Sequence, residues 1–178
     1  MQPAGIARSS AFTASVLQEG PGRHFEDVLS GLEAASHLAE QGEFMAVLRR
    51  QKARAALLIA LADIAGLWSV DEVVAALTRL ADVMLGASID FLLRAEAAKG
   101  NMRLADPAHP SRGCGYVALA MGKHGAGELN YSSDIDLIVF YDLDGPTLAE
   151  GIEPSPFFVK VAQGLSRVLQ QRTGDGYV

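Results

Sequence analysis

Residues 122–139 read GKHGAGELNYSSDIDLIV, and this stretch decides the fold of the second half of the chain. A glycine-rich turn leads to Asp134 and Asp136, and an apolar run follows. A second apolar run, residues 116–121, precedes the turn. Short apolar runs bounded by glycine and polar residues are typical of strands. The sequence therefore predicts a strand, then a turn or one-turn helix, then a second strand over residues 135–141.

The two aspartates are candidate metal ligands and catalytic residues. Side chains alternate along a strand, so Asp134 and Asp136 are expected on one side of it. Neighbouring carboxylates repel each other unless a cation offsets the charge, and Mg²⁺ or Mn²⁺ serves this purpose where phosphate chemistry follows. An Asp-x-Asp pair at a strand end is also a common turn or cap. The glycine turn at this spacing favours the metal site.

The glycine turn itself predicts a phosphate-binding segment. A turn that enters a short helix exposes backbone N–H groups, to which a phosphate can bind, and Lys123 adds a positive charge beside Gly122. We therefore expect Gly122 and Lys123 to contact the phosphates of a nucleotide. Ser132 and Ser133 have two alternative roles, donation to a phosphate or capping of the strand.

The residues before this stretch predict helices. Apolar residues recur at helical spacing over residues 24–39 and 43–65. Ser69 and Glu72 have the spacing of a capping box, which predicts a third helix ending near Lys99. After the second strand and a polar loop, Ser155 and Pro156 are the expected N-cap and first residue of a last helix, which runs to Gln171.

The composition of the segments between these elements suggests how the chain is divided. Residues 1–22 are rich in small and polar residues without a period, which predicts an unstructured lead-in. The prolines and glycines of residues 101–115 predict a connector. We therefore expect a helical portion over residues 23–112 and a separate core over residues 113–178.

Overall composition excludes several function classes. The chain has 178 residues, 49 % of them apolar, and a formal net charge of −6. An acidic chain with no basic cluster does not suit nucleic-acid binding. No apolar stretch has the length of a membrane span or a secretory signal. The single cysteine, Cys114, cannot form an internal disulfide, which favours a reducing cytoplasm.

The order of strand, glycine turn and acidic strand resembles the nucleotidyltransferase superfamily to which DNA polymerase beta belongs. Residues 121–138 more closely resemble the signature of the bifunctional glutamine synthetase adenylyltransferase and adenylyl-removing enzymes. The similarity covers most of the chain beyond about residue 45. The resemblance implies an α+β fold, in which an N-terminal helical portion precedes a DNA polymerase beta-like nucleotidyltransferase core that is incomplete at its C-terminal end.

The resemblance also implies a reaction. One half of such an enzyme transfers AMP from ATP to a glutamine synthetase tyrosine, and the other removes AMP by phosphorolysis and releases ADP. Two segments resemble the N-terminal, adenylyl-removing half: LNYSSDIDLI, residues 129–138, and QRTGDGYV, residues 171–178. Implied with it are Mg²⁺, or Mn²⁺, and ATP or ADP as ligands, and glutamine synthetase and the PII signal protein as partners. There are two alternatives to the adenylyl-removing half: the adenylylating half, and a non-catalytic module that docks either partner.

Two departures from the family pattern matter. His124 stands where the family usually has an apolar residue, either as a neutral variation or to make a local contact, whereas a metal ligand would need a second histidine nearby. Superfamily members also carry a third carboxylate on a later strand, which the resemblance implies just beyond Val178. On this expectation the chain as given turns over poorly or not at all.

Overall fold

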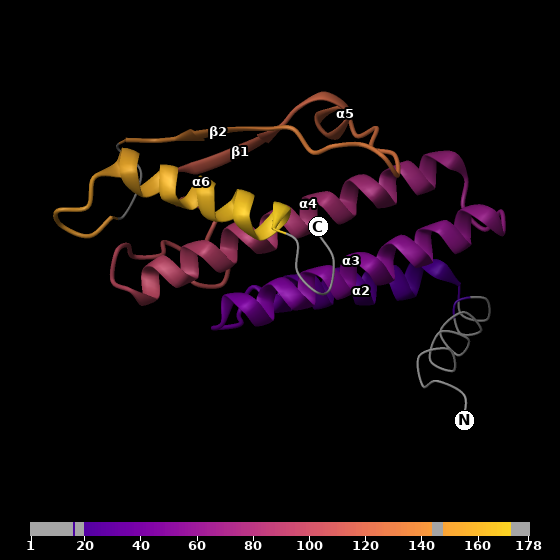
Figure 1. Cartoon of the computed structure of the whole chain (residues 1–178), viewed down its shortest axis with the longest axis horizontal. Helices are drawn as coiled ribbons and strands as arrows, with labels where there is room; N and C mark the ends of the chain where they lie inside the picture. The colour runs from indigo at the N-terminus through magenta and orange to yellow at the C-terminus, as the bar shows by residue number, and fades with distance from the viewer. Residues whose placement is uncertain (1–15, 17–19, 144–147, 172–178) are drawn as a thin grey trace.

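The computed structural model describes Val16, residues 20–143 and residues 148–171. Three long helices come first: α2 (Pro21–Ala35), α3 (Gln41–Ile64) and α4 (Val70–Ala98). Strand β1 (Tyr116–Ala120), the single turn α5 (Gly122–Gly125), strand β2 (Leu137–Tyr141) and helix α6 (Pro154–Gln170) follow. Figure 1 shows the sheet on one side of α4 and α6, with α2 and α3 on the opposite side. The predicted α+β class is confirmed.

The helix ends show how well local rules predict this chain. Helix α4 begins with the predicted capping box: Ser69 Oγ accepts a hydrogen bond from Glu72 N–H, and Ser69 N–H donates to the Glu72 carboxylate at 2.7 Å. The predicted start of α6 is wrong, because Glu153 is the N-cap and Pro154 the first helical residue. Pro154 satisfies the preference for proline in the first turn as well as Pro156 does, so the sequence did not distinguish the two.

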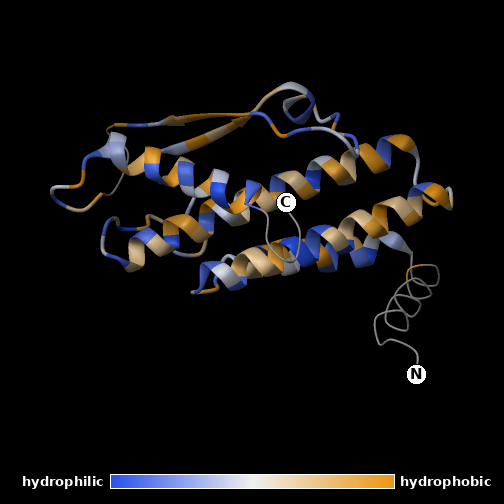
Figure 2. Ribbon diagram, in the orientation of Figure 1, coloured by the Kyte–Doolittle hydropathy of each residue, from blue (hydrophilic) through white to orange (hydrophobic). Residues whose placement is uncertain are grey.

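The sheet consists of β1 and β2, paired antiparallel with Val117 opposite Phe140 and Leu119 opposite Ile138. These four apolar residues are 44 to 53 % exposed, so the outer face of the sheet is apolar, as the colouring of the strands in Figure 2 also shows. The other face packs on α6, where the rings of Tyr116 and Tyr141 stack on Phe158 at centroid distances of 5.7 and 5.2 Å.

The second strand is shorter than predicted, because it begins at Leu137 instead of residue 135. One hydrogen bond continues the pairing beyond it, from Met121 N–H to Asp136 O at 2.8 Å. Gly122 then has a φ of +55°, which turns the segment that follows β1 away from the sheet. Asp134 and Ile135 therefore have no strand partner, and Asp134 and Asp136 both precede β2.

Helix α4 contributes to two apolar clusters. One lies between α2, α3 and α4 and includes the stacked rings of Phe44 and Phe91, 4.2 Å apart. The other lies between α4, α6 and the sheet. Val168, near the end of α6, belongs to the first cluster. The predicted boundary near residue 112 falls in the connector, but α4 belongs to the packing on both sides of it.

A buried arginine joins the helical portion to α6. Arg49 of α3 is 1 % exposed and donates hydrogen bonds to Met45 O at 2.9 Å, to Val168 O at 3.3 Å and to Gln171 O. Carbonyls at the end of a helix lack partners within the helix, and a cation there also complements the helix dipole. Arg49 therefore fixes the C-terminal end of α6.

Two predicted segments lie mainly outside the described residues. Of the lead-in over residues 1–22, the structure describes Val16, which is 1 % exposed in the first apolar cluster, and residues 20–22, with α2 starting at Pro21. Residues 173–178, where a Thr-Gly-Asp-Gly run predicts a turn and Tyr177 and Val178 predict the start of a strand, lie outside them entirely. Within the described part of the chain, no helix has both the length and the apolar character needed to cross a bilayer.

Candidate active site

The glycine turn follows directly from β1 and needs its glycines for steric reasons. Gly122 has its positive φ in the left-handed region. A Cβ at Gly125 would lie 2.4 Å from Ala120 O, so no larger residue fits without moving the backbone. The turn therefore folds tightly over the end of β1, and it leaves Lys123 exposed.

Asp136 lies beside this turn. Its backbone carbonyl accepts the hydrogen bond from Met121 N–H, and its Oδ2 is 3.6 Å from the position that a Cβ at Gly122 would occupy. The structure thus brings together Asp136 and Gly122, which are 14 positions apart in the sequence. This juxtaposition joins an expected metal ligand to the expected phosphate-binding turn.

Asp134 and Asp136 are both exposed. Within the residues that the structure describes, neither carboxylate takes part in a hydrogen bond or ion pair. The described part of the chain likewise contains no group of three or more His, Cys, Asp or Glu side chains arranged to hold a metal ion. Carboxylates are the ligands that a hard cation such as Mg²⁺ prefers, and this ion often binds only one or two of them and keeps water or substrate phosphate as its other ligands.

The segment before the aspartates is shaped by a turn around Asn130. Ser133 Oγ donates to Asn130 Oδ1 and accepts from Asn130 N–H, both at 3.0 Å, and Ser132 N–H donates to the same Oδ1 at 3.0 Å. Asn side chains commonly form such turns, so the spacing of Asn130 and Ser133 was a signal that the sequence analysis missed. The Ser133 hydroxyl is used by the turn, and Ser132 is exposed.

The helices hold this segment through side chains that sequence analysis did not single out. His124 Nε2 lies 2.8 Å from Asp82 Oδ1, and Leu129 N–H donates to Thr78 Oγ1 at 3.4 Å. His124 therefore makes the local contact that was one of its two expected roles. Asp82 and Thr78 lie 42 and 51 residues from their partners, so no local sequence signal could have identified them.

A third contact comes from the end of α3, where Tyr131 O–H donates to Asp63 Oδ2 at 3.0 Å. Partial burial, together with this hydrogen bond and the charge of Asp63, raises the pKa of Tyr131. The phenol therefore stays protonated and remains a donor at neutral pH. Elsewhere, burial raises the pKa of the Cys114 thiol, which agrees with an unreactive structural cysteine.

Comparison with known proteins gives a consistent result. The profile of the family described as "Glutamate-ammonia ligase adenylyltransferase" matches residues 6–178. Three similar proteins carry the name "Bifunctional glutamine synthetase adenylyltransferase/adenylyl-removing enzyme". The chain is 58 % identical to that of Rhodopseudomonas palustris strain BisB5 over 97 % of its length, and 56 % identical to that of strain TIE-1 over 92 %. It is 48 % identical to that of Xanthobacter autotrophicus over 92 %.

The match covers only part of these relatives, since the chain spans 16 to 18 % of their length. The residues matched nevertheless include the whole helical portion, both strands, the glycine turn and the two aspartates. The chain thus belongs to the glutamate-ammonia ligase adenylyltransferase family.

Proposed function

We propose that this chain is part of an enzyme that removes AMP from adenylylated glutamine synthetase by metal-dependent phosphorolysis. The observation that carries the proposal is the position of the Asp136 carboxylate beside Gly122 of the glycine turn. In the reaction, a phosphate oxygen attacks the adenylyl phosphorus, the bond to the tyrosine oxygen breaks, and tyrosine and ADP leave. The names of the relatives include both this activity and the opposite one.

Each residue of the site has a proposed task. Asp134 and Asp136 would hold Mg²⁺ or Mn²⁺, which would offset the negative charge of the reacting phosphate groups. Gly122 allows the backbone to approach the phosphates closely, and Lys123 contributes a positive charge. Ser132, an exposed residue two positions before Asp134, is proposed to donate a hydrogen bond to a phosphate. No protein nucleophile is needed, because phosphate itself attacks.

The proposal extends to ligands and partners. ADP is the nucleotide product, and glutamine synthetase is the protein substrate; ATP would be the nucleotide substrate of the adenylylating reaction. We propose the PII signal protein as a regulatory partner and the cytoplasm as the location. A third carboxylate from residues that follow Val178 in longer proteins is proposed to complete the site, so activity is to be measured in a protein that continues past this residue.

The proposal is tested with Asp134→Asn and Asp136→Asn combined in such a longer protein. We expect Mg²⁺-dependent release of ADP from adenylylated glutamine synthetase to fall by roughly 10³-fold or more, because both metal ligands lose their charge. The matched control is Glu128→Gln, which neutralises an exposed acid in the same segment and should change the rate by less than about twofold. Retained activity in the double variant would contradict the metal assignment.

The same protein distinguishes the two halves of the family reaction. If the chain belongs to the removing half, ADP release requires orthophosphate, and the aspartate variants abolish this activity. If it belongs to the adenylylating half, the same variants abolish transfer of AMP from ATP to unmodified glutamine synthetase and leave the phosphate-dependent reaction intact. Loss of neither activity would favour a non-catalytic docking module.

A further inference from the structure

His124, the buried residue of the glycine turn, contacts Asp82 of helix α4. We infer that this pair positions the turn on α4 and thereby sets how well Gly122 and Lys123 hold a phosphate group. The inference rests on the proposed function of the turn, but its structural part can be tested without activity.

The burial of His124 shows why the pair matters. His124 is the buried residue of α5, and its side chain is 1 % exposed, whereas the side chain of Asp82 is 61 % exposed. A buried imidazole requires a hydrogen-bond partner, and within the described part of the chain Nδ1 has none. The hydrogen bond of 2.8 Å to Asp82 is therefore what fixes the orientation of the ring.

A second contact on the same helix face keeps the other end of the segment in place. Thr78 precedes Asp82 by one helical turn, and its hydroxyl accepts from the N–H of Leu129, a residue that is 4 % exposed. The segment from His124 to Leu129 is thus attached to α4 at both ends. Because Lys123 directly precedes His124, a shift of the ring moves the exposed cation as well.

Packing alone would not require this arrangement. An apolar side chain at position 124 would fill the same space without needing an acceptor on α4. With His124 in place, removal of the acceptor leaves a buried imidazole with no partner, and that loss exceeds what the hydrogen bond contributes when intact. We therefore expect the effects of substitutions at positions 82 and 124 to be strongly coupled. Simple packing predicts no such coupling.

The test uses three variants. Asp82→Ala removes the acceptor, Asp82→Asn keeps an oxygen in its place, and Asp82→Ala combined with His124→Leu removes the need for an acceptor. In the chain itself, we expect amide hydrogen exchange at residues 122–127 to accelerate about tenfold in Asp82→Ala, with exchange in α2 and α3 unchanged. Asp82→Asn should exchange within about twofold of the wild type, and the double variant should recover most of the protection.

Kinetics in a longer protein give the second measurement. Asp82→Ala should raise the KM for phosphate about tenfold and change kcat by less than about threefold, because the turn is displaced while the metal ligands remain. Asp82→Asn should restore the KM. Unchanged exchange in Asp82→Ala, or equal loss in Asp82→Ala and Asp82→Asn, would overturn the inference. A wild-type protein with no activity would contradict the proposed function instead, and the exchange result would still decide the role of the pair.

Discussion

The connector, residues 101–115, and the motif loop, residues 121–136, are both glycine-containing polar segments attached to α4, but they use their polar groups differently. In the connector, charged side chains from α4 bind the backbone. In the motif loop, the exposed charged side chains of the loop itself are not used to hold it in place. Polar groups that are already paired stabilise a structure, whereas exposed charges held on a fixed backbone are available to a ligand.

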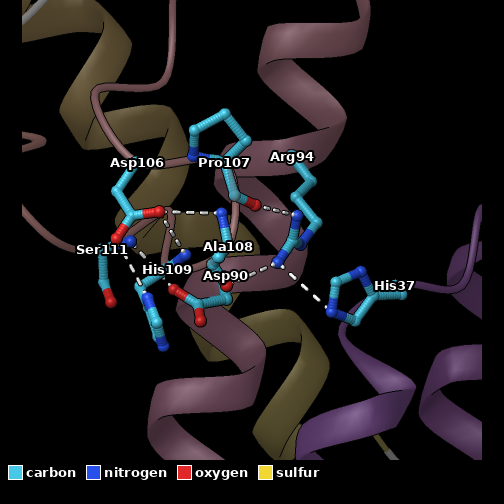
Figure 3. A network of polar contacts seen from close by, with 8 residues as sticks. All are labelled: His37, Asp90, Arg94, Asp106, Pro107, Ala108, His109 and Ser111. Carbon is cyan, nitrogen blue, oxygen red and sulfur yellow. Dashed lines mark hydrogen bonds and ion pairs between the residues drawn. The ribbon is translucent and has the colours of Figure 1, made fainter.

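The connector shows the first arrangement in detail (Figure 3). Arg94 donates to Pro107 O at 2.6 Å and to Ala108 O at 3.1 Å, and Asp90 accepts from Ser111 N–H at 2.9 Å. These two side chains lie one helical turn apart on α4. They bind carbonyl and amide groups that would otherwise have to be solvated, so the connector follows the helix closely.

The motif loop shows the second. Lys123, Asp134 and Asp136 are exposed, while the contacts that hold the loop to α4 come from His124 and from the backbone of Leu129. The groups that hold the loop in place are thus different from the groups proposed to bind metal and phosphate. Substitution of a proposed site residue should therefore reduce activity without loss of stability. Substitution of an α4 side chain that binds the connector should lower stability and leave the rate per folded molecule nearly unchanged.

The largest expected effect comes from Asp136→Asn alone. We expect the metal-dependent rate to fall by about 10³-fold, because the cation loses one of its two proposed ligands. Thermal unfolding without metal should be unchanged, since the carboxylate is exposed. Added Mn²⁺ should raise the midpoint of the wild type but not that of the variant. A variant that unfolds at markedly lower temperature without metal would show that Asp136 is structural.

Arg94→Met tests the connector, where we expect a loss of stability and little change in rate. Two hydrogen bonds to connector carbonyls and a contact of 3.4 Å to His37 Nε2 are lost, so the free energy of unfolding should fall by about 1.5–3 kcal/mol. The rate per folded molecule should change by less than about twofold. Urea unfolding measures the first quantity, with Arg23→Met, an exposed arginine on α2, as the control. A large loss of rate in folded Arg94→Met protein would break the distinction between the two segments.

Local rules predicted much of the fold. Helical periodicity predicted α2, α3 and α4, and the capping box placed the start of α4 at Ser69. The glycine turn and the aspartates were predicted as one site; Asp136 lies beside Gly122, and the roles of these residues stay a prediction. These features depend on backbone preferences and on residues close in sequence, which is why a single sequence reveals them.

Long-range contacts were not predictable in this way. Arg49 binds Val168 across 119 positions, and Asp82 binds His124 across 42. Many exposed or partly exposed acids and arginines have the same local pattern, so only the packed fold selects the partners. The length of β2 was also missed, because it depends on where Gly122 turns the opposing strand away.

Glu96 supports a smaller, pH-dependent prediction for the connector. Burial raises its pKa, but hydrogen bonds from Lys99, Asn101 and Lys160 outweigh this and lower the pKa below the ordinary value. A carboxyl with a lowered pKa in the folded state contributes stability above its unfolded pKa, and this stability is lost as the pH falls through the folded value.

As the pH falls below the ordinary glutamate pKa, the wild type should therefore lose stability that the variant Glu96→Gln never had. We expect a difference of no more than about 1 kcal/mol, since solvent screens the two lysines. Urea unfolding at several pH values measures it, with Glu150→Gln, an exposed glutamate, as the control. Equal pH dependence in the wild type and Glu96→Gln would show that this anchor of the connector contributes nothing.

The smallest effect is expected at Ser133, where a structural and a ligand-binding role give opposite results. Ser133→Ala removes both hydrogen bonds to Asn130 in an exposed turn, so the free energy of unfolding should fall by only about 0.5 kcal/mol. The KM for phosphate should change by less than about threefold, and Ser133→Thr should restore both values. Ser132→Ala, which leaves the turn intact, is the matched variant. A tenfold rise in KM at unchanged stability would instead make Ser133 a phosphate donor, and the motif loop would then use even its turn-forming hydroxyl for binding.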